Sequence, residues 1–169
     1  MSERLLTIQN LSTHFFTDAG VIPAVNDVSF DIKQGETVGV VGESGCGKSV
    51  TAHSIMRLIP EPPGKIVHGK IFLEDTELTT LPINQMRKIR GNQISMIFQE
   101  PMTSLNPVMT IGKQIIEAIR LHTNKTNQEA RKLTIELLAK VGIPSPETRV
   151  DEYPHQLSGG MKQRVMIAM

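Results

Sequence analysis

The sequence is short of the residues that mark several protein classes. It has one cysteine and no tryptophan among 169 residues, and aromatic residues make up 4% of it. A single cysteine excludes a disulfide or a cysteine-built zinc cluster within these residues. The scarcity of aromatic side chains also argues against a stacking platform for single-stranded nucleic acid.

Neither sign of charge dominates, and no long hydrophobic run is present. Lys and Arg number 18 against 17 Asp and Glu, a net charge of +1 that gives no electrostatic case for a nucleic-acid partner. No stretch approaches the roughly 20 apolar residues of a membrane span. The residues after Met1 lack the apolar core of a signal peptide. We therefore expect one domain, or part of one, in the cytoplasm.

The most informative feature that is present is a glycine-rich loop. Residues 42–49 read G-x-x-x-x-G-K-S. Residues 36–41 before it predict a buried strand, and residues 49–59 after it predict a helix that ends at Pro60. A strand, a glycine loop and a helix together present backbone N–H groups and a helix N-terminus to an anion. The sequence therefore predicts a nucleoside triphosphate site.

The residue types in the loop suit phosphate chemistry. The glycines allow the backbone to approach the phosphates closely. Lys48 is expected to reach the β- and γ-phosphates, and the Ser49 hydroxyl is expected to ligate Mg²⁺. Cys46 is either a reactive thiol at a helix N-terminus or a tolerated variable position, and the second interpretation is favoured.

A second anion site is predicted near the end of the sequence. Residues 157–164 read L-S-G-G-M-K-Q-R, just before another run with helical periodicity. Ser158 is a natural N-cap, and Gly159 and Gly160 expose N–H groups where the helix starts.

The remaining segments predict a mixed α/β chain. Alternation of apolar and polar residues predicts strands at 5–16 and 25–32, and these two strands suggest a small antiparallel sheet. Residues 65–73 predict a hairpin that turns near His68 and Gly69, and residues 94–98 predict a buried strand. Residues 84–90 predict a short basic helix whose Lys88 and Arg90 are solvated. Residues 110–121 and 127–141 predict two longer helices, and Thr126 and Glu129 form a capping box before the second.

These motifs together resemble the nucleotide-binding subunit of an ABC transporter. Residues 42–49 match the family's Walker A loop, residues 157–163 match its signature, and Gln99 stands at the Q-loop glutamine. Residues 98–107 and 153–164 resemble the corresponding segments of oligopeptide, dipeptide and nickel importers. The resemblance extends over nearly the whole sequence.

The resemblance implies a fold as well. It implies an α/β fold: a P-loop NTPase core with a parallel sheet and flanking helices, an N-terminal antiparallel β-subdomain, and a helical subdomain. The expected division is 1–99 for the ATP-binding core and β-subdomain, 100–157 for the helical subdomain, and 158–169 for the start of the signature helix.

The resemblance also implies roles for particular residues. Gln99 would contact Mg²⁺ and the attacking water, and Phe16 would stack on adenine, with Phe15 as its rival because the strand parity is open. The implied nucleotide-binding residues are Phe16, Gly42, Glu43, Ser44, Gly45, Cys46, Gly47, Lys48, Ser49 and Gln99, with Ser49 and Gln99 as Mg²⁺ ligands. The residues implied to bind ATP held by an opposite subunit are Leu157, Ser158, Gly159, Gly160 and Gln163.

The implied function is that of an ATP-binding subunit that powers import of dipeptides or oligopeptides, or of nickel. Its implied partners are a second ATPase subunit, identical or not, integral membrane permease subunits and, indirectly, an extracytoplasmic solute-binding protein, with no nucleic acid. It would lie at the cytoplasmic face of the membrane. The alternatives are a soluble ABC ATPase without membrane partners and a non-functional fragment.

One part of the family pattern is missing from these residues. The Walker B strand, the catalytic glutamate, the D-loop and the switch histidine would follow Met169. We therefore expect residues 1–169 by themselves to bind ATP without hydrolysing it. In the family's sheet, strands from beyond Met169 lie between the strand of residues 37–41 and the strand of residues 94–98. Without them the edges of both strands lose their hydrogen-bond partners, so we also expect residues 1–169 by themselves to be unstable.

Overall fold

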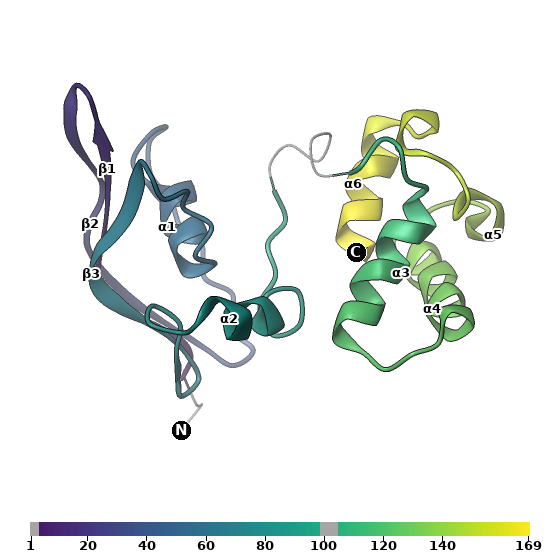
Figure 1. Cartoon of the computed structure of the whole chain (residues 1–169), viewed down its shortest axis with the longest axis horizontal. Helices are drawn as coiled ribbons and strands as arrows, with labels where there is room; N and C mark the ends of the chain where they lie inside the picture. The colour runs from purple at the N-terminus through teal and green to yellow at the C-terminus, as the bar shows by residue number, and fades with distance from the viewer. Residues whose placement is uncertain (1–3, 99–104) are drawn as a thin grey trace. The chain divides into compact units, whose positions relative to one another are not determined.

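The computed structural model describes residues 4–98 and 105–169, which belong to two compact units, Met1–Arg90 and Gly91–Met169 (Figure 1). The first unit contains β1 (Arg4–Thr17), β2 (Gly20–Lys33), α1 (Lys48–Ile55), β3 (Gly64–Leu73), β4 (Thr76–Glu77) and α2 (Ile83–Ile89). The second contains α3 (Ile111–His122), α4 (Asn127–Lys140), α5 (Pro146–Arg149), the 3₁₀ turn η2 (Pro154–Gln156) and α6 (Gly159–Ala168). Within the described ranges, no helix has both the length and the apolar character needed to cross a membrane.

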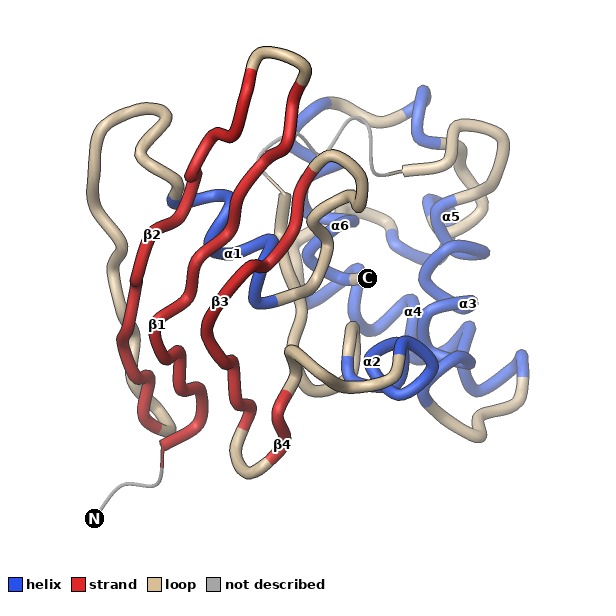
Figure 2. The backbone as a smooth tube through the Cα atoms, turned by 60° about the vertical axis from the view of Figure 1, so that its left-hand side comes forward, coloured by secondary structure: helices blue, strands red, loops and turns tan. Residues whose placement is uncertain are grey.

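The first unit contains one antiparallel sheet with the strand order β2-β1-β3-β4 (Figure 2). The strands predicted at 5–16 and 25–32 are confirmed, and they lie within β1 and β2. Leu6 and Ile8 on one face of β1 are buried and Gln9 is exposed, but Thr7 between them is also buried, so the alternation along β1 is incomplete.

The hairpin predicted within residues 65–73 is wrong, because these residues belong to the single strand β3. Gly69 has a φ of 96°, and a Cβ placed on it would lie 2.5 Å from the carbonyl oxygen of Asn10 on β1. The pairing of β1 with β3 shifts register at this point. The extra residue lies in β1, so Gly69 faces a β-bulge at Asn10 and does not form a turn, and the chain reverses only after Leu73.

The buried strands predicted at residues 36–41 and 94–98 are also wrong. Residues 37–41 and 94–98 have no strand assigned, and Val41 and Ile97 are 96% and 60% exposed. A strand forms only when its N–H and C=O groups find partners on a neighbour. None of the strands in the described residues pairs with either segment.

The helix that follows the glycine loop ends earlier than Pro60. Arg57 has a φ of 50°, and the Leu58 N–H donates to the His53 carbonyl at 2.8 Å. The left-handed conformation of Arg57 and the hydrogen bond from Leu58 back to His53 define a Schellman cap, which satisfies the last carbonyls of α1. Local cap geometry therefore ends the helix before the proline does.

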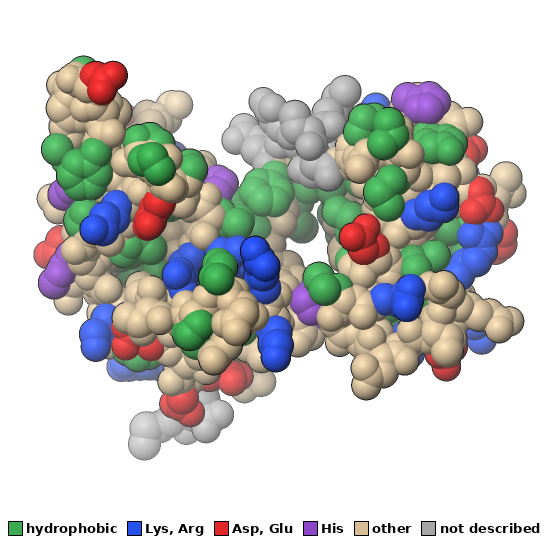
Figure 3. Space-filling view, viewed as in Figure 1, with side chains coloured by type: hydrophobic (Ala, Val, Ile, Leu, Met, Phe, Trp, Pro, Cys, Tyr) green, Lys and Arg blue, Asp and Glu red, His purple; other side chains and the backbone are tan. Residues whose placement is uncertain are grey.

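Arginine side chains hold this end of α1. Arg90 donates from Nε to the Met56 carbonyl at 2.8 Å and from Nη2 to the Arg57 carbonyl at 2.6 Å. Arg90 is half-buried, so the prediction that it is solvated is wrong, while Lys88 is exposed as predicted. Burial lowers the pKa of Arg90, and the charges of Arg57 and Arg87 lower it further. Figure 3 shows Lys and Arg side chains gathered over the part of this unit where α2 lies.

The second unit packs α3, α4 and α6 around one apolar core. Its buried members are Leu105, Ile111, Ile115, Leu138, Ile143, Val150, Leu157, Val165 and Ala168. The predicted capping box is confirmed: the Thr126 hydroxyl accepts from the Glu129 N–H at 3.3 Å, and the Glu129 carboxylate accepts from the Thr126 N–H at 2.8 Å. The hydrogen bonds from Thr126 lower the pKa of Glu129.

Candidate functional site

The lysine of the glycine loop hydrogen-bonds back to the start of the same loop. The Lys48 ammonium donates to the carbonyl oxygens of Gly42 and Glu43, each at 2.7 Å, and lies 3.5 Å from the Cys46 sulfur. Lys48 is also the first residue of α1. Its charge therefore lies between the two ends of the loop, at the start of the helix, where a bound phosphate would accept its hydrogen bonds.

Gly47 explains how the loop packs on the sheet. It is the N-cap of α1 with a φ of 93°, which an L side chain rarely adopts. A Cβ at this position would lie 2.2 Å from the carbonyl oxygen of Ala24 on β2. The glycine allows the helix to start directly against β2, so the sheet fixes the position of the helix N-terminus.

The start of α1 has the electrostatics of an anion site. Its first turn contains no acidic residue, so the positive end of the helix dipole has no carboxylate of its own. Ser49 lies in this first turn and is exposed, as is Cys46 in the loop. Within the described residues, no group of three or more His, Cys, Asp and Glu side chains could hold a metal ion.

The start of α6 has the same character. The Ser158 hydroxyl accepts from the Met161 N–H at 3.3 Å, which makes Ser158 the N-cap as predicted. The first turn again contains no acidic residue. A Cβ on Gly159 or on Gly160 would meet nothing within 4 Å, and neither residue has a positive φ.

The other residues of this motif divide between core and surface. Leu157 is 5% exposed and belongs to the apolar core of the second unit, whereas Gln163 is exposed on α6. Arg164 donates to the Gly142 carbonyl at 2.7 Å, just after the end of α4. The leucine and the arginine thus hold α6 in place, and Ser158 with the two glycines is left open to solvent.

The parity of β1 distinguishes the two adenine-stacking candidates. The Thr13 hydroxyl lies 2.8 Å from the Ser54 hydroxyl of α1, so Thr13 faces this helix. Phe15 is two residues further along a regular strand and therefore points to the same face, whereas Phe16 points to the opposite face and is 49% exposed. The bulge around Asn10 shifts the alternation along β1, which is why the sequence pattern left the parity open.

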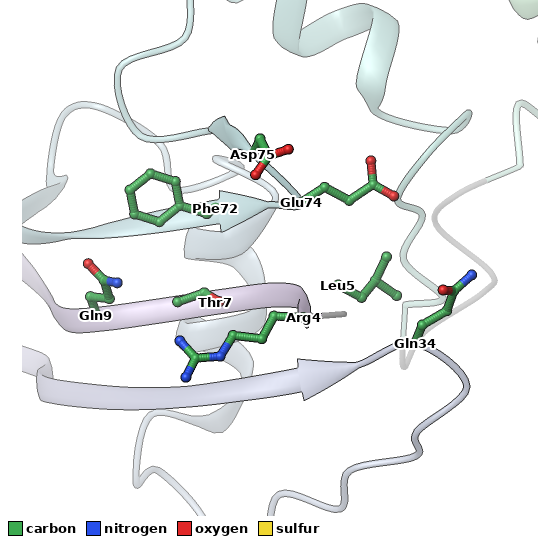
Figure 4. A pocket seen from close by; sticks show the side chains of 8 residues that line it. All are labelled: Arg4, Leu5, Thr7, Gln9, Gln34, Phe72, Glu74 and Asp75. Carbon is green, nitrogen blue, oxygen red and sulfur yellow. The ribbon is translucent and has the colours of Figure 1, made fainter. Parts of the chain in front are cut away.

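One predicted site residue cannot be placed. Gln99 lies outside the described residues. A hollow of about 570 Å³ opens on the face of the sheet opposite Leu6 and Ile8, and Figure 4 shows that Thr7, Gln9 and Phe72 contribute to it from β1 and β3. None of the predicted nucleotide-binding residues that the structure describes lines this hollow.

A glycine loop held by its own lysine, ahead of a helix with a free positive end, defines a P-loop nucleotide-binding protein. The chain belongs to the ABC transporter family, because the family's model matches residues 25–169. Members of this family bind ATP. The resemblance noted from the motifs is therefore confirmed.

Solved structures support the fold. A dimeric ATP-binding cassette in a post-hydrolysis state, bound to ADP and Pi, has a TM-score of 0.84 and 27% sequence identity, covering 96% of this chain and 67% of that chain. A bacterial ABC transporter cassette, also dimeric, matches equally well, at a TM-score of 0.84. The predicted α/β fold of an incomplete ABC domain is therefore confirmed, although residues 37–41 and 94–98 form no strands here. The subdivision at 99/100 and 157/158 stays a prediction.

Two curated relatives are named as ATP-binding proteins of peptide transport. The oligopeptide transport ATP-binding protein AppD of Bacillus subtilis is 56% identical over 165 residues, which cover 98% of this chain and 50% of that protein. The dipeptide transport ATP-binding protein DppD of the same organism is 50% identical over 167 residues, which cover 99% of this chain and 50% of that protein. The chain thus spans about half the length of these relatives.

Proposed function

We propose that the chain is the ATP-binding part of a subunit that powers import of dipeptides or oligopeptides at the cytoplasmic face of a membrane. The observation that carries this proposal is the pair of helix N-termini, at α1 and α6, each preceded by a motif of the family and each without an acidic residue in its first turn. The names of the relatives supply peptides as the class of solute.

In this proposal, residues 42–49 hold the phosphates of ATP. Lys48 exchanges its two carbonyl partners for phosphate oxygens, and the exposed Ser49 hydroxyl ligates Mg²⁺ together with Gln99. The family's ATP site also uses the signature motif of a second subunit. Ser158, Gly159 and Gly160 are exposed and open, which suits them to contact ATP bound by that partner.

The proposed partners are a second ATPase subunit and integral membrane permease subunits, with a solute-binding protein acting outside the membrane. The test is uptake of a radiolabelled dipeptide by proteoliposomes that contain the full-length protein with its permease subunits. We expect uptake only with the full-length protein and internal ATP-Mg²⁺. ATP hydrolysis without any peptide uptake, and without binding to the permease, would favour the soluble ABC ATPase instead.

We also propose that Phe15, and not the Phe16 predicted from the sequence, stacks on adenine. Phe15 lies on the face of β1 that α1 covers, and a Cβ placed on Gly64 would lie 3.0 Å from its ring. Replacing Phe15 by alanine should weaken ATP binding about tenfold, because one aromatic-base stack contributes roughly 1–3 kcal/mol. Isothermal titration of the full-length protein with ATP measures this effect.

Three variants separate stacking from packing at this site. Phe15→Tyr retains a ring and should bind ATP almost as the wild type does. Phe16→Ala removes the exposed ring on the other face and should change the affinity little. If Phe16→Ala weakened ATP binding more than Phe15→Ala, the assignment to Phe15 would be wrong.

A further inference from the structure

A small hollow, called here the isoleucine hollow, opens beside the end of α1 in the first unit. Its volume is about 200 Å³, and it is lined by Arg57, Ile59, Glu61, Ile66 and Ile83. All three isoleucines keep part of their surface exposed, and Ile83 is 51% exposed. Apolar side chains around a concave site are typical of ligand pockets, and this one is smaller than the roughly 300 Å³ of a drug-sized site. The isoleucine hollow therefore suits one apolar side chain of a small molecule.

The two charged residues of the isoleucine hollow have opposite signs and are not paired. Among the residues that the structure describes, neither Arg57 nor Glu61 takes part in an ion pair. The Arg57 guanidinium donates from Nη1 to the carbonyls of Leu78 and Leu81, and its other two nitrogens have no partner within the same residues. One cation and one anion are thus available to a ligand in the same hollow.

Arg57 belongs to a group of positive charges. Burial of Arg90 is the main cause of its lowered pKa, and the charges of Arg57 and Arg87 lower that pKa further. These guanidinium groups are therefore close enough to repel one another. A carboxylate bound at Arg57 would reduce this repulsion, which favours an anionic group at this end of the hollow.

The loop that carries Glu61 is held from two sides. The Gly64 N–H donates to the Pro60 carbonyl at 2.9 Å, and the Phe16 N–H on β1 donates to the Pro63 carbonyl at 2.8 Å. The backbone at Glu61 is therefore fixed before a ligand binds, which lowers the entropic cost of binding.

A second hollow, called here the polar hollow, adjoins the first. Its volume is about 340 Å³, and it shares Arg57, Glu61 and Ile66 with the isoleucine hollow. Its remaining lining residues are Val67, His68, Gly69, Lys70, Glu77, Thr79 and Thr80. Lys70 and Glu77 pair with each other at 3.6 Å, so Arg57 and Glu61 remain the unpaired charges at the boundary. The polar hollow suits the polar backbone of a ligand whose side chain enters the isoleucine hollow.

We propose that the two hollows together bind a dipeptide with an apolar side chain. Its terminal carboxylate lies at Arg57 and its terminal ammonium at Glu61, while its side chain covers the three isoleucines. A dipeptide fits better than a free amino acid, because its terminal charges are about 3.5 Å further apart and its peptide group can use the polar hollow. None of the predicted nucleotide-binding residues that the structure describes lines either hollow, so this site goes beyond the proposed function.

The test is NMR of the full-length protein with ¹³C-labelled isoleucine methyl groups, titrated with leucyl-alanine. We expect the methyl signals of Ile59, Ile66 and Ile83 to shift with a Kd of about 1 mM, as for a ligand of this size. The signals of Ile111 and Ile115, which are fully buried in the second unit, should stay unchanged. Absence of shifts at the three isoleucines at about 20 times that concentration would overturn the inference.

Modified ligands test the two charges separately. Acetyl-leucyl-alanine lacks the ammonium and leucyl-alanine amide lacks the carboxylate, so each should bind about tenfold more weakly. Binding of both derivatives as tight as that of leucyl-alanine would contradict the assignment to Arg57 and Glu61. Equally tight binding of free leucine would show that the site does not select a dipeptide.

Variants with exposed replacements test the protein side. Glu61→Gln should weaken binding about tenfold, whereas Glu136→Gln, which neutralises an exposed residue of α4, is the control and should bind normally.

Ile83→Thr should weaken binding about fourfold through the loss of apolar contact. Its control is Ile22→Thr, which replaces an isoleucine of β2 that is 55% exposed. Wild-type affinity in both Glu61→Gln and Ile83→Thr would place the dipeptide elsewhere. The titration needs neither ATP nor permease, so a failure of peptide uptake would disprove the proposed function without affecting this result.

Discussion

Replacing Lys48 by alanine in the full-length protein should lower kcat/KM for ATP hydrolysis by about 10³-fold, the scale expected when a charged donor to a transferring phosphoryl group is lost. The ammonium lies between Gly42 and Glu43 and at the first residue of α1, so no other side chain of the loop can place a positive charge there. Hydrolysis measured by phosphate release, together with ATP titration, checks both affinity and rate.

The same variant should fold almost normally. The two carbonyls that Lys48 contacts belong to exposed residues, and water replaces the lysine at little cost, about 1 kcal/mol or less. Lys65→Ala, which removes an exposed lysine from β3, is the control and should leave hydrolysis unchanged. Retention of substantial hydrolysis by Lys48→Ala would show that the loop does not hold the reacting phosphate.

Replacing Gly160 by alanine should act in opposite directions on stability and on activity. Gly160 lies in the first turn of α6 without a positive φ, and a Cβ there meets nothing within 4 Å. Alanine should therefore stabilise the protein by about 0.5–1 kcal/mol, because glycine loses more conformational freedom in a helix. Nothing within the described residues explains why this position is a glycine.

The proposed function offers an explanation, namely ATP held by a second subunit. If ATP held by a second subunit approaches the start of α6, an added methyl group displaces it by a fraction of an ångström to an ångström. A displacement of this size can lower the rate about 10²-fold. We therefore expect hydrolysis by the Gly160→Ala subunit pair to fall by that factor while ATP binding to each subunit's own loop is retained.

Denaturant unfolding and hydrolysis assays on the same preparation test both effects. Lys132→Ala, which replaces an exposed residue of α4, is the control and should change neither the stability nor the hydrolysis rate substantially. A Gly160→Ala protein that is more stable and fully active would remove the case for a partner at this helix. One that is less stable would show that the glycine has a role within its own chain.

Features that depend on a few neighbouring residues were predicted well. The capping box at Thr126 and Glu129 and the N-cap at Ser158 have the hydrogen bonds that their residue types predict. These signals are accurate because the donor and the acceptor lie within four residues, so no distant segment decides the outcome.

Several features that need a distant partner were predicted wrongly. Residues 37–41 and 94–98 have the composition of buried strands, yet they form none, since composition alone provides no neighbour to pair with. The predicted hairpin at Gly69 failed for a related reason. A glycine in a strand fits a turn or the close approach of another backbone, and only the pairing with β1 shows that Gly69 lies opposite a bulge at Asn10.

The sequence by itself determined the chemistry of this protein: a loop with Lys48 and Ser49, a capped glycine start for α6, and the family to which both belong. The tertiary structure alone decided which side chains face that chemistry. Pairing and the bulge in the sheet turn Phe15 toward α1. The physical reason is that motif chemistry is local, whereas the direction and burial of a side chain depend on segments far away in the sequence.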